Sequence, residues 1–142
     1  MSSLFSLYRL ATTLGSPLIM HHMKKRVKSG KEDLNRINER LGQASHPRPN
    51  TPLAWVHAAS VGELTSMLPL VEALLTAHPA LHVLITSGTV TSADLLAKQL
   101  PERTIHQYLP FDRVFYVNAF LDHWVPDLVL WTESELWPNL IT

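Results

Sequence analysis

The stretch LAWVHAASVGELTSMLPLVEALLTA, residues 53–77, decides the fold. Its first six residues, 53–58, form a short apolar run rich in strand-forming side chains, and an apolar periodicity typical of a helix covers residues 64–77. Between them lies ASVGE, residues 59–63, a loop of mostly small residues that permits a tight turn. The order of strand, turn and helix is that of a parallel βαβ unit.

The same order repeats along the rest of the chain. Short apolar runs predict strands at residues 82–86, 104–108 and 128–131, and helices are expected to end near Leu100 and to cover residues 113–124. Strands alternating with helices predict an α/β fold with a Rossmann-like parallel sheet, in which ligands bind at the carboxyl ends of the strands. Three polar loops follow predicted strands, at residues 59–63, 87–92 and 132–139.

The charges divide the chain into two parts. The 142 residues carry 12 Lys and Arg against 12 Asp and Glu, yet residues 1–50 have a net charge of +6 and residues 51–142 a net charge of −6. The stretch QASHPRPNTP, residues 43–52, has three prolines and little apolar content, which is typical of a linker. We therefore predict a basic arm with its linker over residues 1–50 and an α/β body over residues 51–142.

The arm begins with an amphipathic pattern. Apolar residues recur every three or four positions, as on one face of a helix, although Gly15 and Pro17 interrupt them. The longest uncharged stretch, residues 10–23, has 14 residues, whereas a membrane-spanning helix needs about 20. The run KKRVKSGK at residues 24–31 follows, and an apolar helix followed by cations is typical of attachment to an anionic membrane surface. The alternative is a core-packing helix followed by a solvated basic turn.

Several classes of protein are excluded or disfavoured. The chain has no cysteine, which excludes disulfides, zinc-thiolate sites and cysteine nucleophiles. The arm lacks an aromatic RNA-binding pattern and the body is acidic, so we expect no nucleic-acid partner. No dinucleotide or Walker fingerprint is present, which disfavours a nucleotide-dependent oxidoreductase. The eight histidines show no spacing typical of metal ligands, and His57, beside the first loop, is expected to be a core histidine or to support the site from behind.

Glutamates follow two of the predicted strands. Glu63 is expected at the start of a helix, facing the cleft at the strand ends, where a carboxylate can act as a general base or cap the helix. In TESELWPN, Glu133 and Glu135 share one side if the chain is extended. They can hold sugar hydroxyls or stabilise a positively charged transition state, or one of them caps a helix that begins at Pro138. Trp137 is expected to pack against other side chains and not to stack on a ligand.

The loop SGTVTS offers a second group of candidate binding residues. Ser87, Gly88 and Thr89 precede a helix, where hydroxyls and amides can cradle a phosphate or a sugar hydroxyl. Thr91 or Ser92 is the expected helix cap. Ordinary capping of that helix is the alternative interpretation of the whole loop.

Four segments in order resemble the N-terminal half of the 3-deoxy-D-manno-octulosonic acid (Kdo) transferases. They are KSGKEDLNRINERLG at residues 28–42, WVHAASVGE at 55–63, ITSGTVTSA at 85–93, and YLPFD at 108–112 with ESELWPNLI at 133–141. The resemblance implies a GT-B glycosyltransferase of lipopolysaccharide synthesis, of which residues 51–142 are an incomplete N-terminal, acceptor-binding domain. The C-terminal domain for the CMP-sugar is then absent, and we expect this fragment alone to be inactive.

The resemblance also implies a reaction and roles for single residues. Kdo moves from CMP-Kdo to a lipid A precursor, lipid IVA, at the cytoplasmic face of the bacterial inner membrane, with inversion and without a cofactor or an obligatory metal. The glutamate of SVGE, Glu63, is the implied base, and Glu133 the implied transition-state stabiliser with Glu135 in support. The expected substrate-binding residues also include the small and hydroxyl residues of both loops, namely Ser60, Gly62, Ser87, Gly88 and Thr89.

A second hypothesis belongs to another class of protein. A membrane-bound α/β module without catalysis would use the same acidic cleft to bind a sugar or a basic partner. Only the transferase hypothesis requires the carboxylates of Glu63 and Glu133 to converge on one cleft.

Overall fold

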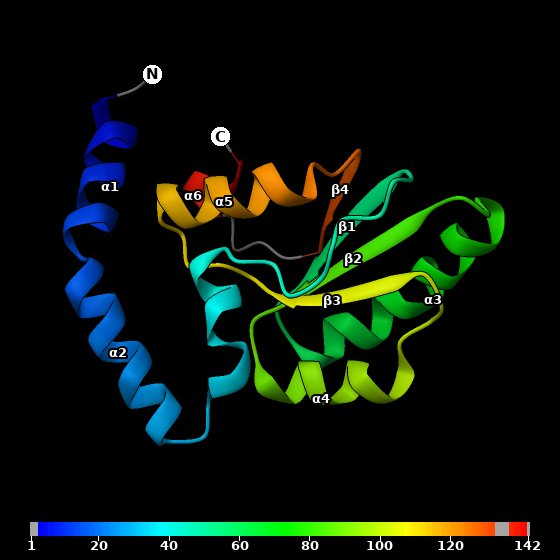
Figure 1. Ribbon diagram of the computed structural model, residues 1–142, viewed down its shortest axis with the longest axis horizontal. Coiled ribbons are helices and arrows are strands. Elements are labelled where there is room, and N and C mark those ends of the chain that lie inside the picture. The colour runs from blue at the N-terminus through cyan, green and yellow to red at the C-terminus, as the bar shows by residue number, and fades with distance from the viewer. Residues whose placement is uncertain (1–2, 133–136, 142) are drawn as a thin grey trace.

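The computed structural model describes residues 3–132 and 137–141 and contains a four-stranded sheet (Figure 1). Its strands are all parallel and lie in the order β3-β2-β1-β4. They comprise β1 (Leu53–Ala58), β2 (His82–Ser87), β3 (Thr104–Tyr108) and β4 (Leu128–Trp131). The helices of the body are α3 (Val61–Ala77), α4 (Val90–Gln99), α5 (Val114–Trp124) and α6 (Pro138–Ile141). The predicted α/β fold with a parallel sheet is confirmed.

The order in which successive strands are added to the sheet reverses at β1. Strands β2 and β3 lie on one side of β1, and β4 pairs with its other edge, with Trp131 opposite His57. In open parallel sheets the crevice at such a switch point is the usual ligand site. The carboxyl ends of β1 and β4 are therefore the place where a site is expected.

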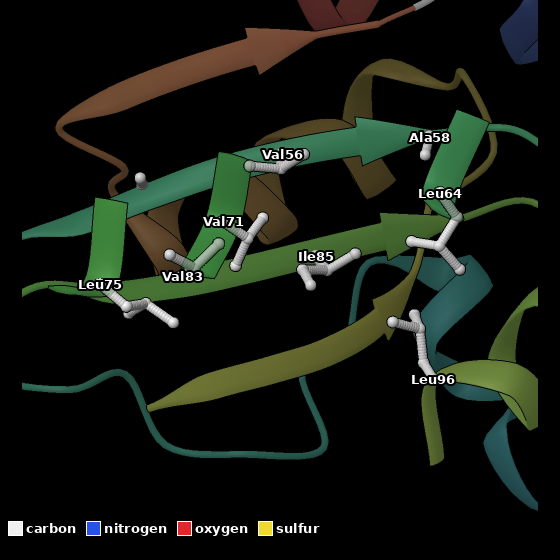
Figure 2. Packing of buried hydrophobic residues seen from close by; sticks show 9 residues of the cluster. Val56, Ala58, Leu64, Val71, Leu75, Val83, Ile85 and Leu96 are labelled. Carbon is white, nitrogen blue, oxygen red and sulfur yellow. The ribbon is translucent and has the colours of Figure 1, made fainter. Parts of the chain in front are cut away.

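Helices cover both faces of the sheet (Figure 1). Because side chains alternate along a strand, Val56 and Ala58 of β1 point to the face where Leu64 and Val71 of α3 pack (Figure 2). Trp55 points to the opposite face, where its ring lies 4.9 Å from that of Phe120 in α5. Burial on both faces explains why β1 is apolar at every position except His57.

Two helices begin directly after strand ends, and both use a hydroxyl cap. The Oγ atom of Ser60 accepts a hydrogen bond from the Glu63 amide at 3.3 Å at the start of α3. At the start of α4, Thr89 Oγ1 accepts from the Ser92 amide at 3.2 Å. The expected cap at Thr91 or Ser92 is therefore wrong. Thr89 is the last extended residue, so its hydroxyl is the one that reaches an amide three positions on.

The arm consists of two helices, α1 (Ser3–Leu14) and α2 (Ser16–Lys28), which lie beside the carboxyl ends of the strands (Figure 1). The predicted break is confirmed, since Gly15 precedes α2 and a proline occupies its first turn. The Tyr8 hydroxyl of α1 donates a hydrogen bond to Asp112 Oδ2 at 2.6 Å. Five leucines of the two arm helices are more than half exposed. They are Leu4, Leu7, Leu10 and Leu14 in α1 and Leu18 in α2. Over the described residues, every helix is too short or too polar to cross a membrane.

A short 3₁₀ helix, η1 (Leu34–Leu41), was not predicted from the sequence. η1 lies within residues 1–50, the segment whose net charge predicts an arm. It nevertheless packs against the end of β3, where Glu39 accepts a hydrogen bond from the Tyr108 amide at 2.8 Å. Gly42 ends it with a φ of +81°, and a Cβ atom at this position would lie 2.1 Å from the Tyr116 carbonyl oxygen. A glycine is therefore required for conformation and for space.

The variant Gly42→Ala is expected to lower the free energy of unfolding by at least about 2 kcal/mol. Its Cβ atom would clash with the Tyr116 backbone, and alanine is strained at a left-handed φ. The matched control is Gly62→Ala in the first turn of α3, where a Cβ atom meets nothing within 4 Å. Alanine there is expected to be neutral or to stabilise by up to about 1 kcal/mol. Urea unfolding of both variants checks the pair, and equal free energies would contradict this account of Gly42.

Candidate active site

A pocket of about 280 Å³ opens at the carboxyl ends of the strands. Its walls include His57 and Ala59 after β1, Gly88 after β2, and the segment 109–112 after β3. Helix α2 of the arm closes another side with His22 and Arg26. The volume is close to the lower end of the range of roughly 300–1,000 Å³ typical of small-molecule sites. The pocket therefore lies where the topology predicts a ligand.

A buried ion cluster forms part of the pocket wall. The Glu32 carboxylate accepts hydrogen bonds from Arg26 at 2.9 Å and from Arg40 at 3.1 Å. Arg40 is 6% exposed, and it also donates to the carbonyls of Leu109 at 3.0 Å and Gly88 at 2.6 Å. Burial lowers the pKa of Arg40, while the charge of Glu32 opposes that shift. This one side chain joins η1 to the loops that follow β2 and β3.

A second ion pair fixes η1 on β3. Both oxygens of Glu39 accept from Arg36, each at 2.9 Å, and Arg36 also donates to the His106 carbonyl at 2.9 Å. The guanidinium groups of Arg36 and Arg40 each lie 4.7 Å from the centre of the Tyr108 ring. The two cations of η1 are thus held by the carboxylates of Glu32 and Glu39, and by carbonyls and an aromatic face of the body.

Glu63 lies in the first turn of α3, as predicted. Its Oε2 atom accepts a hydrogen bond from the Ala59 amide at 3.0 Å, so the carboxylate folds back over the loop after β1. Together with the bond from its own amide to Ser60, this resembles the reciprocal capping arrangement of helix N-termini. The capping interpretation thus describes the contacts of Glu63. They place a preorganised carboxylate at the positive end of a helix, and its role as a base remains a prediction.

His57 is 1% exposed and belongs to the core, as predicted, while its ring also reaches the pocket. Its Nδ1 atom lies 2.9 Å from the Thr86 hydroxyl, and its ring centre lies 4.3 Å from that of Trp131. Burial lowers the pKa of His57 to about 4, although the bond to Thr86 and the charge of Glu63 oppose the shift. His57 is therefore neutral at physiological pH.

Hydrogen bonds connect the residue that follows β4 to the end of β1. The backbone amide and the hydroxyl of Thr132 both donate to the His57 carbonyl, at 3.3 and 2.7 Å. The loop TESELWPN thus begins beside the loop that carries Glu63. Glu133 and Glu135 lie outside the described residues. Trp137 is 39% exposed and lines the pocket, and its expected role in packing and not in stacking stays a prediction.

The sequence model of one protein family, described as 3-deoxy-D-manno-octulosonic-acid transferase (Kdo transferase), matches residues 35–142. The chain belongs to the Kdo transferase family. It is 40% identical over 135 residues to a 3-deoxy-D-manno-octulosonic acid transferase of Rickettsia bellii, covering 95% of this chain and 32% of the relative. A probable mitochondrial 3-deoxy-D-manno-octulosonic acid transferase of Arabidopsis thaliana is 38% identical over 137 residues, covering 96% of this chain and 31% of the relative.

A third relative, a 3-deoxy-D-manno-octulosonic acid transferase of Haemophilus influenzae, is 38% identical over 109 residues, covering 75% of this chain and 25% of the relative. The chain spans about a third of the length of the first two relatives. The match to the Kdo transferase family includes all four strands and η1 except its first residue, Leu34. It therefore covers the described pocket residues from Arg40 onward.

The other predicted binding residues of this Kdo transferase domain fall in different places. Gly88 lines the pocket, and its carbonyl is occupied by Arg40. The Ser87 hydroxyl is buried at 2.9 Å from His106 Nε2, and the hydroxyls of Ser60 and Thr89 cap helices. A Cβ atom added at Gly62 would meet nothing within 4 Å. Ordinary helix capping therefore describes the contacts of Ser60 and Thr89. Of the predicted binding residues in these two loops, Gly88 is the one that lines the pocket.

Sequence reasoning assigned no role to three residues of the pocket wall, Glu32, Arg40 and Asp112. Asp112 Oδ2 accepts from Tyr8 of the arm and, at 3.3 Å, from the amide of Asn139 in α6. All three residues lie in segments that carried the family resemblance, 28–42 and 108–112, so the motifs marked them without showing their contacts. Within residues 3–132 and 137–141, no group of three or more acidic or histidine side chains is placed to hold a metal ion.

Two buried histidines predict that the domain loses stability in mild acid. Burial lowers the pKa of His57 to about 4, and burial with the charges of Arg36 and Arg40 lowers that of His106 to about 3. The unfolded chain binds these protons near pH 6.5, so the contribution of the two histidines to stability is constant above about pH 7 and falls as the pH drops from 6.5 toward 4. Between pH 7 and pH 5 the loss is up to about 2 kcal/mol for each histidine.

Urea unfolding at intervals between pH 5 and pH 7.5 checks this expectation. His106→Gln keeps a polar group facing Ser87 and removes one titrating site, so the slope of stability against pH should decrease. A free energy of unfolding that is the same at pH 5 and pH 7 would contradict the prediction.

Proposed function

We propose that this chain forms the acceptor-binding half of an enzyme that transfers Kdo from CMP-Kdo to the lipid A precursor lipid IVA. The proposal rests on membership of the Kdo transferase family. The observation that carries it is geometric, since the loop with Glu63 follows β1 and Thr132, the residue before ESELWPN, is hydrogen-bonded to His57 at the end of β1, on the switch-point side of the sheet. A pocket lies beside that point.

In the proposed reaction Glu63 is the general base. It removes the proton from the acceptor hydroxyl while that oxygen bonds to the anomeric carbon of Kdo, and CMP leaves from the opposite face with the electrons of the broken bond. A single displacement of this kind inverts the anomeric centre. Glu133, supported by Glu135, stabilises the positive charge that develops on the sugar ring. The bond from the Ala59 amide supports the role of Glu63, because it fixes the carboxylate before substrate binds.

The arm attaches the enzyme to the cytoplasmic face of the inner membrane in this proposal. Five leucines of α1 and α2 are more than half exposed, which is unusual for a face without a partner. Cations follow in the last turns of α2, and each cation near an anionic surface contributes about 1 kcal/mol to attachment. A lipid acceptor is then presented at the surface beside the pocket.

The test is a transfer assay on the full-length protein with CMP-Kdo and lipid IVA. Formation of Kdo-lipid IVA and release of CMP, both followed by mass spectrometry, are the expected result. A folded protein that binds lipid IVA but releases no CMP would support the non-catalytic binding module instead.

A further inference from the structure

A second concave surface lies on the arm, away from the strand-end pocket. It is a groove of about 560 Å³ between α2 and η1, and it shares no residue with the first pocket. Its walls are mainly apolar, formed by Met20, Met23, Val27, Leu34 and Ile37. The volume lies within the range of roughly 300–1,000 Å³ typical of ligand sites. We refer to it as the arm groove.

Three lysines border the arm groove, Lys24, Lys25 and Lys28. None of their ammonium groups makes a hydrogen bond or an ion pair with any residue in the described part of the chain, whereas the adjacent Arg26 is held by Glu32. Among the residues that the structure describes, no carboxylate lines the groove. The surface therefore combines an apolar trough with positive charges that the protein itself leaves uncompensated.

We propose that the arm groove binds one anionic phospholipid, with an acyl chain along the apolar walls and the phosphate against Lys24 and Lys28. Charge complementarity selects this occupant, because an apolar chain next to a phosphate matches apolar walls next to unpaired ammonium groups. A basic or neutral peptide would leave these cations unpaired. The bound lipid is neither substrate of the proposed reaction, so this inference goes beyond the proposed function.

Binding in the groove has a consequence for the strand-end pocket. Helix α2 presents Lys24 and Lys28 to the groove and His22 and Arg26 to the pocket. A lipid that fills the space between α2 and η1 holds both elements together and so fixes the wall of the pocket that α2 provides. The arm then attaches the protein to the membrane, and the geometry of the pocket wall depends on the anionic lipid content of that membrane.

The test uses a soluble lipid, dihexanoylphosphatidylglycerol below its micelle concentration, with zwitterionic dihexanoylphosphatidylcholine as the comparison. Methyl NMR of ¹³C-labelled methionine reports directly, since Met20 and Met23 line the groove and Met67, packed in the core on the α3 side of the sheet, is an internal control. We expect saturable one-to-one binding of the anionic lipid that shifts Met20 and Met23 but not Met67. The zwitterionic lipid is expected to bind at least about fivefold more weakly.

Two variants test the two parts of the groove. Lys24→Gln with Lys28→Gln should weaken binding about 30-fold, because each cation contributes about fivefold. Leu34→Glu places an anion at the edge of the groove on a residue that is 66% exposed, so it should abolish binding without unfolding the protein. The control is Lys31→Gln with Lys98→Gln, which removes the same charge from exposed sites outside the groove.

The outcomes separate this proposal from its alternatives. If the control weakens binding as much as Lys24→Gln with Lys28→Gln, the attraction is diffuse and the groove proposal fails. If Leu34→Glu binds the lipid as wild type does, the groove is not the site. If sedimentation shows a dimer that Leu34→Glu disrupts, a second copy occupies the groove instead. The lipid-binding assay contains no CMP-Kdo and measures no transfer. Its results therefore stand even if the proposed transfer reaction is wrong.

Discussion

Glu63→Gln in the full-length protein is expected to lower the rate of Kdo transfer by about 10²–10⁴-fold, the usual contribution of a general base. Glutamine keeps a side-chain oxygen that can accept from the Ala59 amide, so the cap of α3 persists while the basic carboxylate is lost. The free energy of unfolding is therefore expected to change by less than about 1 kcal/mol. Initial rates of CMP release and urea unfolding of the same samples measure the two quantities.

The comparison variants for Glu63 separate its two roles. Glu63→Ala removes the base and the cap together, so it should lose transfer and also about 1 kcal/mol of stability. Glu72→Gln makes the same charge change on an exposed position of α3 and should leave transfer unchanged. Near-normal turnover by Glu63→Gln would show that Glu63 is only a helix cap.

The second large effect is on stability and concerns Arg40. Arg40→Gln leaves the buried Glu32 with only the partly exposed Arg26 and removes the bonds to the carbonyls of Leu109 and Gly88. Breaking a buried ion pair from one side typically costs about 3–5 kcal/mol, so we expect a loss of that size in urea unfolding. The exposed variant Lys98→Gln should change stability by less than about 0.5 kcal/mol.

A double variant tests the reason for that loss. Glu32→Gln with Arg40→Gln removes the buried charge that Arg40→Gln leaves with Arg26 as its remaining partner, so it should be more stable than Arg40→Gln alone. If the double variant is the less stable of the two, the cost comes from the lost carbonyl contacts and not from the weakened pairing of Glu32.

The sequence predicts those parts of the structure that follow from local periodicity. Each strand and each body helix was located because apolar runs and small-residue loops alternate, and the break at Gly15 follows from its neighbour Pro17. The position of Glu63 follows in the same way, since Ser60 is a typical cap three residues before it. Local patterns therefore account for the sheet and for one side of the candidate site.

The other side of the site depends on long-range contacts that local patterns do not encode. Glu32, Glu39 and Arg40 appear in the sequence as part of a solvated basic arm, because charged residues are mostly exposed. The burial of Glu39 and Arg40 depends on partners that are distant along the chain, such as the Tyr108 amide and the Leu109 carbonyl, and Glu32 is buried with them because it pairs with Arg40. No periodicity marks such a segment, and η1 was missed for that reason.

The strand order also bears on how the chain folds during synthesis. Strands β1, β2 and β3 are neighbours in sequence and in space, so they can pair as they leave the ribosome, whereas the outer edge of β1 waits for β4, whose pairing begins with Ala54 opposite Leu128. Until then that edge is an unpaired strand able to join another chain. Of the strand pairings that the structure describes, the one between β1 and β4 is thus the last to form. A nascent chain halted before residue 128 is expected to need chaperone protection at this edge.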